Sequence, residues 1–137
     1  MSLAEARVRV VDDTSAARQT AHAYVDLLER RDWAGLAALL ADDLVYEMPQ
    51  TRERIRGKDA FLQFNTEYPG DWHLRPRRVI ADGRLAALWL DVRVGDEQQD
   101  ACVWLELSGP GLINKIIDYW PDPYDPPRGR EHLVERW

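Results

Sequence analysis

Three residues with proton-transfer chemistry stand out because each lies beside an otherwise apolar pattern. Tyr24 falls on the apolar stripe of a helical segment, Asp118 on the apolar face of a strand, and His73 just after a helix stop. A tyrosine hydroxyl can donate a hydrogen bond to a ligand oxygen. A buried carboxyl group has a raised pKa, and an imidazole exchanges protons near neutral pH. These residue types predict acid–base chemistry that needs no cofactor.

Each of these residues also has a purely structural interpretation. Tyr24 can be a core aromatic residue whose hydroxyl reaches a neighbouring group, and Asp118 can pair with an arginine or a backbone donor near its strand end. His73 can be a half-exposed loop residue, which is the interpretation we favour for it. His22 lies off the helical stripe and His132 lies in the C-terminal segment, so both are expected to be solvated.

Composition argues against several other classes of site. Three dispersed histidines and one cysteine give no metal-ligand spacing, and there is no glycine-rich phosphate loop. Cys102 has no histidine at motif spacing, so we expect a small hydrophobic residue there and not a nucleophile. We therefore predict no metal and no cofactor.

Charge, hydropathy and cysteine content indicate which partners and which cellular location to expect. The net charge of −6 disfavours nucleic acid and anionic membranes as partners. The longest apolar runs, such as 85–90, are far shorter than the roughly 20 residues that span a bilayer. A single cysteine permits no intrachain disulfide, which is typical of a cytoplasmic protein. We therefore predict a cytoplasmic location.

The segments that would position these residues come in the order helices first, strands last. A loose leader of residues 1–13 is expected to precede a helix capped by Asp13 or Thr14. Turns are predicted at Asp82-Gly83 and Gly95-Asp96. The remaining predicted segments are a short helix from Trp33 to Leu40, a strand 44–48, a charged loop 50–57, a helix 58–68, and strands 72–80, 85–94, 99–108 and 112–120. The 137 residues fit one domain with a core of about 14–120, followed by a proline-rich tail, 121–137, that ends in one turn.

Three stretches carry a family resemblance: AYVDLLERRDWAGLAALLADDLVYEMP (23–49), IRGKDAFLQF (55–64) and INKIIDYW (113–120). Together with the order of segments, they resemble the nuclear transport factor 2-like superfamily. They are most similar to its SnoaL-like branch, which includes polyketide cyclases, steroid isomerases and members of unknown role. The resemblance implies an α+β fold in which a curved antiparallel sheet forms a cone. Three helices from the N-terminal half would pack on the concave side, around an apolar pocket.

The resemblance also shows which catalytic positions of the best-known enzymes of that superfamily have a matching residue in this chain. Its steroid isomerases use a helix tyrosine as an oxyanion donor, an aspartate base near the end of the first strand, and a carboxylic acid on a later strand. By segment matching, Tyr24 takes the tyrosine position, but the two acid positions fall on Met48 and Val103. Without those acids, the isomerisation is not expected by that route.

Strand alternation assigns the remaining residues to two faces. The resemblance implies that Val103 and Trp120 lie on the inner face. Alternation then adds Leu88, Leu90, Leu105, Ile116 and Asp118 to that face, with Met48 and Phe61 as further pocket walls. The outer face carries Trp89, Trp104, Ile117 and Tyr119, which the resemblance implies would form a homodimer interface. Asp91, Arg93 and Asp118 resemble the Asp-Arg-Asp set of epoxide hydrolases in this superfamily. Alternation places Asp91 and Arg93 on the outer face, away from Asp118, unless a bulge turns their side chains to the inner face.

Two functions remain open at this point. One is a pocket protein that acts as a cofactor-independent lyase, isomerase or cyclase on a small hydrophobic or aromatic molecule. The other is a non-catalytic ligand-binding or dimeric assembly module that uses the same pocket. A purely structural dimer is a third class, in which side chains of the protein itself would fill the pocket and Tyr124 of the proline-rich tail could fold over its mouth. Two or more titratable groups within hydrogen-bond reach in the pocket would favour the enzyme.

Overall fold

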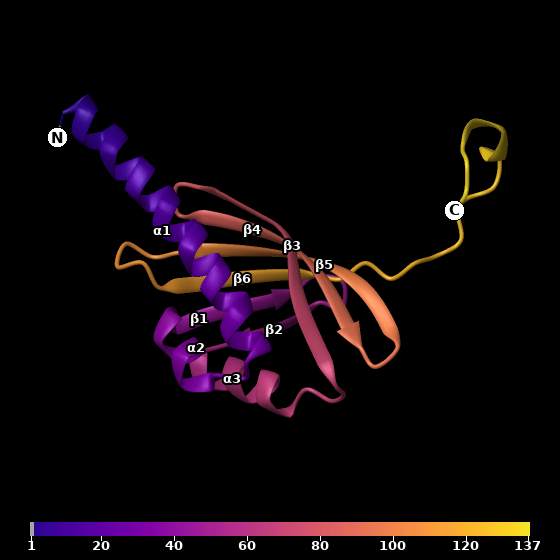
Figure 1. The fold of residues 1–137 in the computed structure, drawn as a ribbon, viewed down its shortest axis with the longest axis horizontal. Coiled ribbons are helices and arrows are strands. Elements are labelled where there is room, and N and C mark those ends of the chain that lie inside the picture. Colours follow the sequence, from indigo (N-terminus) through magenta and orange to yellow (C-terminus); the bar gives the residue numbers. More distant parts are fainter. Residues whose placement is uncertain (1) are drawn as a thin grey trace.

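The computed structural model describes residues 2–137, apart from the side chains of residues 8–11, and the order of helices and then strands is confirmed (Figure 1). The helices are α1 (Leu3–Glu29), α2 (Trp33–Leu39), α3 (Lys58–Glu67) and the 3-10 turn η1 (Glu131–Leu133). The strands are β1 (Leu40–Met48), β2 (Glu53–Arg56), β3 (Trp72–Asp82), β4 (Leu85–Val94), β5 (Glu97–Leu107) and β6 (Ile113–Tyr119).

Helix α1 begins far earlier than the sequence suggested. The Ser2 hydroxyl accepts a hydrogen bond from the Glu5 N–H at 3.2 Å, and the Glu5 carboxylate accepts one from the Ser2 N–H at 2.7 Å. This reciprocal capping box starts the helix, so the predicted loose leader and the cap at Thr14 or Asp13 were wrong. Thr14 instead accepts a hydrogen bond from the Gly83 N–H in the β3–β4 turn, at 2.8 Å.

The six strands form one open, mixed sheet in the order β2-β1-β6-β5-β4-β3. All neighbours are antiparallel except β1 and β6, which run parallel. The α+β class is therefore confirmed, while the expected purely antiparallel sheet becomes a mixed one. Residues 53–56, predicted as part of a loop, form the edge strand β2. This strand is charged and largely exposed, so its sequence lacks the apolar alternation from which a strand is predicted.

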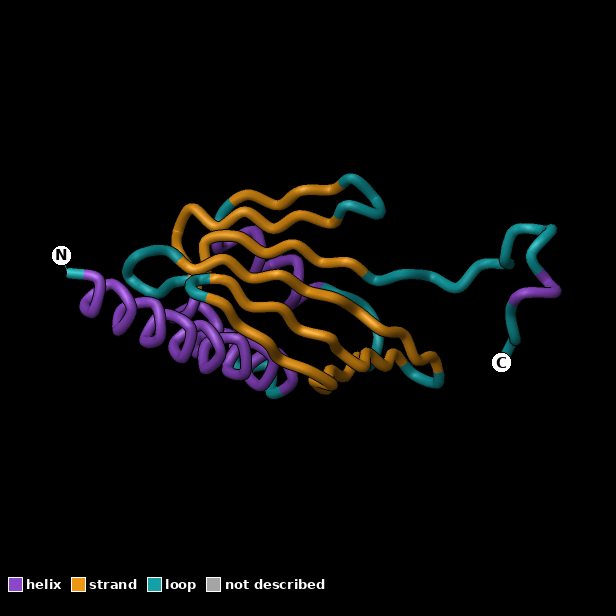
Figure 2. The backbone as a smooth tube through the Cα atoms, turned by 90° about the horizontal axis from the view of Figure 1, so that it is seen from above, coloured by secondary structure: helices purple, strands orange, loops and turns teal. Residues whose placement is uncertain are grey.

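The three helices pack against one face of the sheet, and the core lies between these layers (Figures 1 and 2). Helix α1 lies across β3 and β4, while α3 packs against β1. The apolar stripe of α1, which includes Ala17, Ala21 and Tyr24, is buried as predicted. In the described part of the chain, we find no helix with the length and apolar character needed to cross a membrane. The cytoplasmic location stays a prediction.

The assignment of strand faces is confirmed. Leu88 pairs with Val103, which in turn pairs with Asp118, and both apolar residues are buried on the helix side. On the opposite face, Trp89 and Trp104 are 48% and 44% exposed. On the edge strand β3, the pairing with β4 shifts between Pro76 and Arg78, as in a β-bulge.

Candidate functional site

A hydrogen-bonded pair of titratable side chains lies on the helix side of the sheet. The Tyr46 hydroxyl donates to Asp118 Oδ2 at 2.5 Å. Tyr46 lies opposite Ile116 in the parallel pairing of β1 with β6. Asp118 is two residues further along β6, so its side chain points to the same face as that of Ile116. The pairing of two strands distant in the sequence thus builds this contact.

The second oxygen of Asp118 makes the pair unusual. Asp118 Oδ1 is buried and accepts no hydrogen bond from any residue that the structure describes. Burial raises the pKa of Asp118 to about 6, against the opposing effect of the hydrogen bond from Tyr46. The group is therefore ionised at neutral pH yet easily protonated, and one of its two oxygens has no hydrogen-bond partner among the described residues.

Two tyrosine hydroxyls accompany this carboxyl group. Burial, followed by the negative charge of Asp118, raises the pKa of Tyr24 and of Tyr46. Both phenols therefore stay protonated and can donate hydrogen bonds. Tyr24 comes from α1 and lies close enough to Asp118 for the charge of that carboxylate to raise its pKa, so the helix layer and the sheet layer each contribute one donor.

The side chains around the pair are apolar. Phe61 of α3 lies with its ring centre 5.0 Å from that of Tyr46, and Phe64 lies at 6.0 Å. The predicted wall residues Met48, Phe61, Leu88 and Val103 are all buried in the same core. Trp120, also predicted as a wall, is partly buried, and its backbone N–H donates to Gln50 Oε1 at 2.5 Å.

His73 lies outside this arrangement, at the surface where β3 begins. Its Nδ1 lies 2.8 Å from Glu29 Oε1, its Nε2 lies 3.0 Å from Asp71 Oδ1, and the side chain is 57% exposed. The hydrogen bond with Glu29 and the charge of Asp71 raise the pKa of His73. Both ring nitrogens are thus engaged by surface carboxylates, which agrees with the structural interpretation.

The raised pKa of His73 predicts a pH-dependent contribution to stability. Protonated His73 is stabilised in the folded state, so its contribution is present below pH 6.5 and is lost as pH rises through the raised folded pKa. We expect His73→Gln to lower the melting temperature at pH 5.5 and to leave it nearly unchanged at pH 9. Circular dichroism melts at both pH values measure this, and an equal decrease at both would contradict it.

The alternative Asp-Arg-Asp set is not assembled. Asp91 is buried on the outer face, where Gln98 donates to it at 3.1 Å and Arg93 at 3.3 Å. These contacts lower the pKa of Asp91. Asp118 lies on the inner face, so the sheet separates the two acids. In the described part of the chain, no cluster of potential metal ligands is found.

Tyr46 is the site residue that the sequence interpretation missed. It lies two residues before Met48 on the same strand, so alternation alone would have placed it on the inner face. Its role depends on the neighbouring strand β6, and the sequence order does not reveal that neighbour.

The sequence and the fold of this chain are similar to those of known proteins. The SnoaL-like domain family matches residues 21–116. The chain is similar to a Kribbella flavida protein provisionally named a ketosteroid isomerase, at 50% identity and a TM-score of 0.87, covering 91% of this chain and 92% of that one. It is also similar to an LEH-like epoxide hydrolase of M. tuberculosis, at 25% identity and a TM-score of 0.69, covering 79% of this chain and 84% of that one. No curated protein sequence matches it.

Proposed function

Because the chain belongs to the SnoaL-like domain family, we propose that it is a cofactor-independent enzyme that moves a proton on a small hydrophobic molecule. The observation that carries this proposal is the Tyr46–Asp118 pair with the unpartnered Asp118 Oδ1. A carboxyl group with a pKa of about 6 is matched to proton transfer near neutral pH. The relative named a ketosteroid isomerase, at 50% identity, supports a carbonyl compound as the substrate.

Each group has a distinct part in the proposed reaction. Asp118 Oδ1 removes a proton from the carbon next to a carbonyl, and the electron pair of that C–H bond moves onto the carbonyl oxygen to form an enolate. The protonated Tyr24 hydroxyl donates a hydrogen bond to this oxygen. Return of the proton to the far carbon of a conjugated C=C bond completes an isomerisation. Attack of the enolate carbon on a second carbonyl forms a C–C bond and an alkoxide, which takes the proton back from Asp118 to complete a cyclisation. Asp118 would thus supply the base that Met48 and Val103 cannot.

The apolar walls indicate the kind of substrate. Met48, Leu88 and Val103 offer no hydrogen bonds from their side chains, so they favour a hydrophobic ring. The second candidate is a non-catalytic module that binds the same ring. Two titratable groups within hydrogen-bond distance favour the enzyme, because a module that only binds an apolar ring needs no such pair.

Deuterium exchange at the α-carbons of 2-tetralone, followed by proton NMR in D₂O, tests the proposed proton transfer. We expect the protein to accelerate the exchange and Asp118→Asn to slow it by about 10²–10⁴-fold, the usual contribution of a positioned base. Asp100→Asn, the same change on the outer face, is the matched control and should keep full activity. Binding of 2-tetralone without accelerated exchange would favour the non-catalytic module.

The role of Tyr46 has its own signature. Its hydrogen bond stabilises the Asp118 carboxylate, so Tyr46→Phe should raise the pKa of Asp118. We expect the pH profile of the exchange rate to move to higher pH, with a larger decrease at pH 6 than at pH 8. A uniform decrease at all pH values would assign Tyr46 a packing role only.

A further inference from the structure

The outer face of the sheet carries an exposed aromatic surface. Trp89 pairs across β4 and β5 with Cys102, and Cys102 pairs across β5 and β6 with Tyr119. Trp104 points to the same face two residues after Cys102, and all three aromatic side chains are at least 40% exposed. We call Trp89, Trp104 and Tyr119 the aromatic face. Aromatic residues gathered on a surface in this way are typical of a contact with another protein surface.

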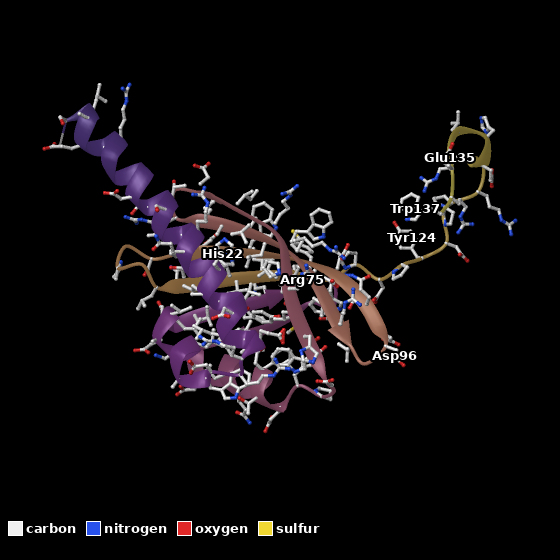
Figure 3. All side chains as sticks on the ribbon, in the orientation of Figure 1. His22, Arg75, Asp96, Tyr124, Glu135 and Trp137 are labelled. Carbon is white, nitrogen blue, oxygen red and sulfur yellow. The ribbon has the colours of Figure 1, made fainter. Side chains whose placement is uncertain are left out.

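The C-terminal segment, residues 121–137, has the complementary property. It leaves the end of β6 and runs out beyond the domain (Figures 1 and 2). Tyr124 is 88% exposed and Trp137 is fully exposed, and both lie on the part of the chain beyond the domain (Figure 3). Tyr124 therefore does not fold over the candidate site of its own chain, as the hypothesis of a purely structural dimer suggested. Four prolines within 121–127 make this part extended and semi-rigid, so a sharp return to its own sheet is disfavoured.

We propose that residues 121–137 of one copy of this chain lie on the aromatic face of a second copy, and that the exchange is mutual. An extended proline-rich segment advances about 3.1 Å per residue, so 121–127 reaches roughly 20 Å. Neighbouring strands lie about 4.8 Å apart, so this reach crosses about four strands. Strand β6 lies in the interior of the strand order, so the C-terminal segment starts from within the sheet and not from its edge. If the outer faces of two copies oppose each other across a twofold axis, each segment can cross onto the outer face of the other copy.

Charge beside the aromatic face supports this occupant. A cavity of about 430 Å³ on the same face is lined by Arg75, Pro76, Arg77, Asp91 and Arg93. Three guanidinium groups and one carboxylate line it, and Asp100 also pairs with Arg77 at 3.3 Å, so the positive charges there still outnumber the negative ones by one. The Arg77 guanidinium carbon lies 5.9 Å from the centre of the Trp89 ring. Asp125, next to Tyr124, has no ion pair with any described residue. A carboxylate two to three residues from the end of the extended segment fits this arginine-lined cavity and would orient the contact.

Cys102 provides a native probe, because it is the only cysteine and lies on the outer face between Trp89 and Tyr119. We expect its labelling by N-ethylmaleimide to slow at least about fivefold as the protein concentration rises through the dimerisation range. Light scattering on the same samples gives the mass. A full-length variant with Tyr124→Ser, Leu133→Ser and Trp137→Ser should lose both the protection and the dimer. Leu3→Ser, at an equally exposed apolar position on α1, is the matched control and should change neither.

Other results would overturn the proposal in distinct ways. Protection that does not depend on concentration would mean that the segment folds back on its own copy. A protected dimer that survives the three serine substitutions would mean that the faces pair without the segment. Rapid labelling at all concentrations would mean that the aromatic face is uncovered. Circular dichroism spectra that match the wild type exclude misfolding, which is not expected because all three substituted side chains are exposed.

Discussion

Replacing Asp118 with asparagine is expected to stabilise the protein relative to the wild type as the pH rises. The folded pKa of Asp118 is about 6, whereas its ordinary value is 3.8. Below the ordinary value, both states are protonated and ionisation has no effect on stability. Above it the unfolded chain ionises first, so the wild type loses stability until the pH passes the folded pKa. A shift of about two units corresponds to about 3 kcal/mol. Asparagine cannot ionise and avoids this loss.

Urea unfolding followed by tryptophan fluorescence between pH 4 and 8 measures this difference. The free energy of unfolding of Asp118→Asn minus that of the wild type should increase by about 2.5 kcal/mol from pH 4 to pH 7.5, because the unfolded chain is already partly ionised at pH 4. Asp100→Asn removes a carboxyl group from the opposite face and should show a nearly flat difference. Parallel stability curves for Asp118→Asn and the wild type would show that Asp118 has an ordinary pKa. The same variant is expected to lose proton transfer, which would make Asp118 a residue that lowers stability and serves function.

The inner face of the sheet could be read from the sequence, while the contact that makes the site could not. Alternation along single strands placed Leu88, Val103 and Asp118 correctly, because the burial of each residue follows a local period of two. The Tyr46–Asp118 hydrogen bond depends on β1 and β6 lying side by side, although 72 positions separate the two residues. No local pattern encodes such a neighbour.

The errors in the predicted elements have local causes. The start of α1 was missed because its first turns carry many charges, although Ser2 and Glu5 had the spacing of a capping box. Strand β2 was missed because an edge strand with exposed charged residues shows no apolar alternation. Both errors lie outside the candidate site, so the predicted inner face survived them.

Phe61→Ala is expected to produce the largest loss of stability among these variants, and to change the site as well. Phe61 is 1% exposed and its ring packs 5.0 Å from that of Tyr46, centre to centre. Removing a buried phenylalanine side chain costs about 3–5 kcal/mol, because apolar contacts are lost and a cavity remains. Tyr46 would lose the ring that holds it in place, and water could reach Asp118 more easily. Better solvation would return the pKa of Asp118 towards its ordinary value.

A double-mutant cycle separates the effect of Phe61 on packing from its effect on Asp118. If Phe61→Ala admits water, Asp118→Asn should stabilise the Phe61→Ala protein at pH 7.5 by less than the roughly 3 kcal/mol expected in the wild type. Phe61→Leu keeps most of the volume, so it should have a much smaller effect on stability and leave the gain from Asp118→Asn unchanged. Urea unfolding of the single and double variants measures these free energies. Strictly additive effects would contradict a coupling between α3 and the carboxyl group, because they would show that Phe61 supports the core without shielding Asp118 from water.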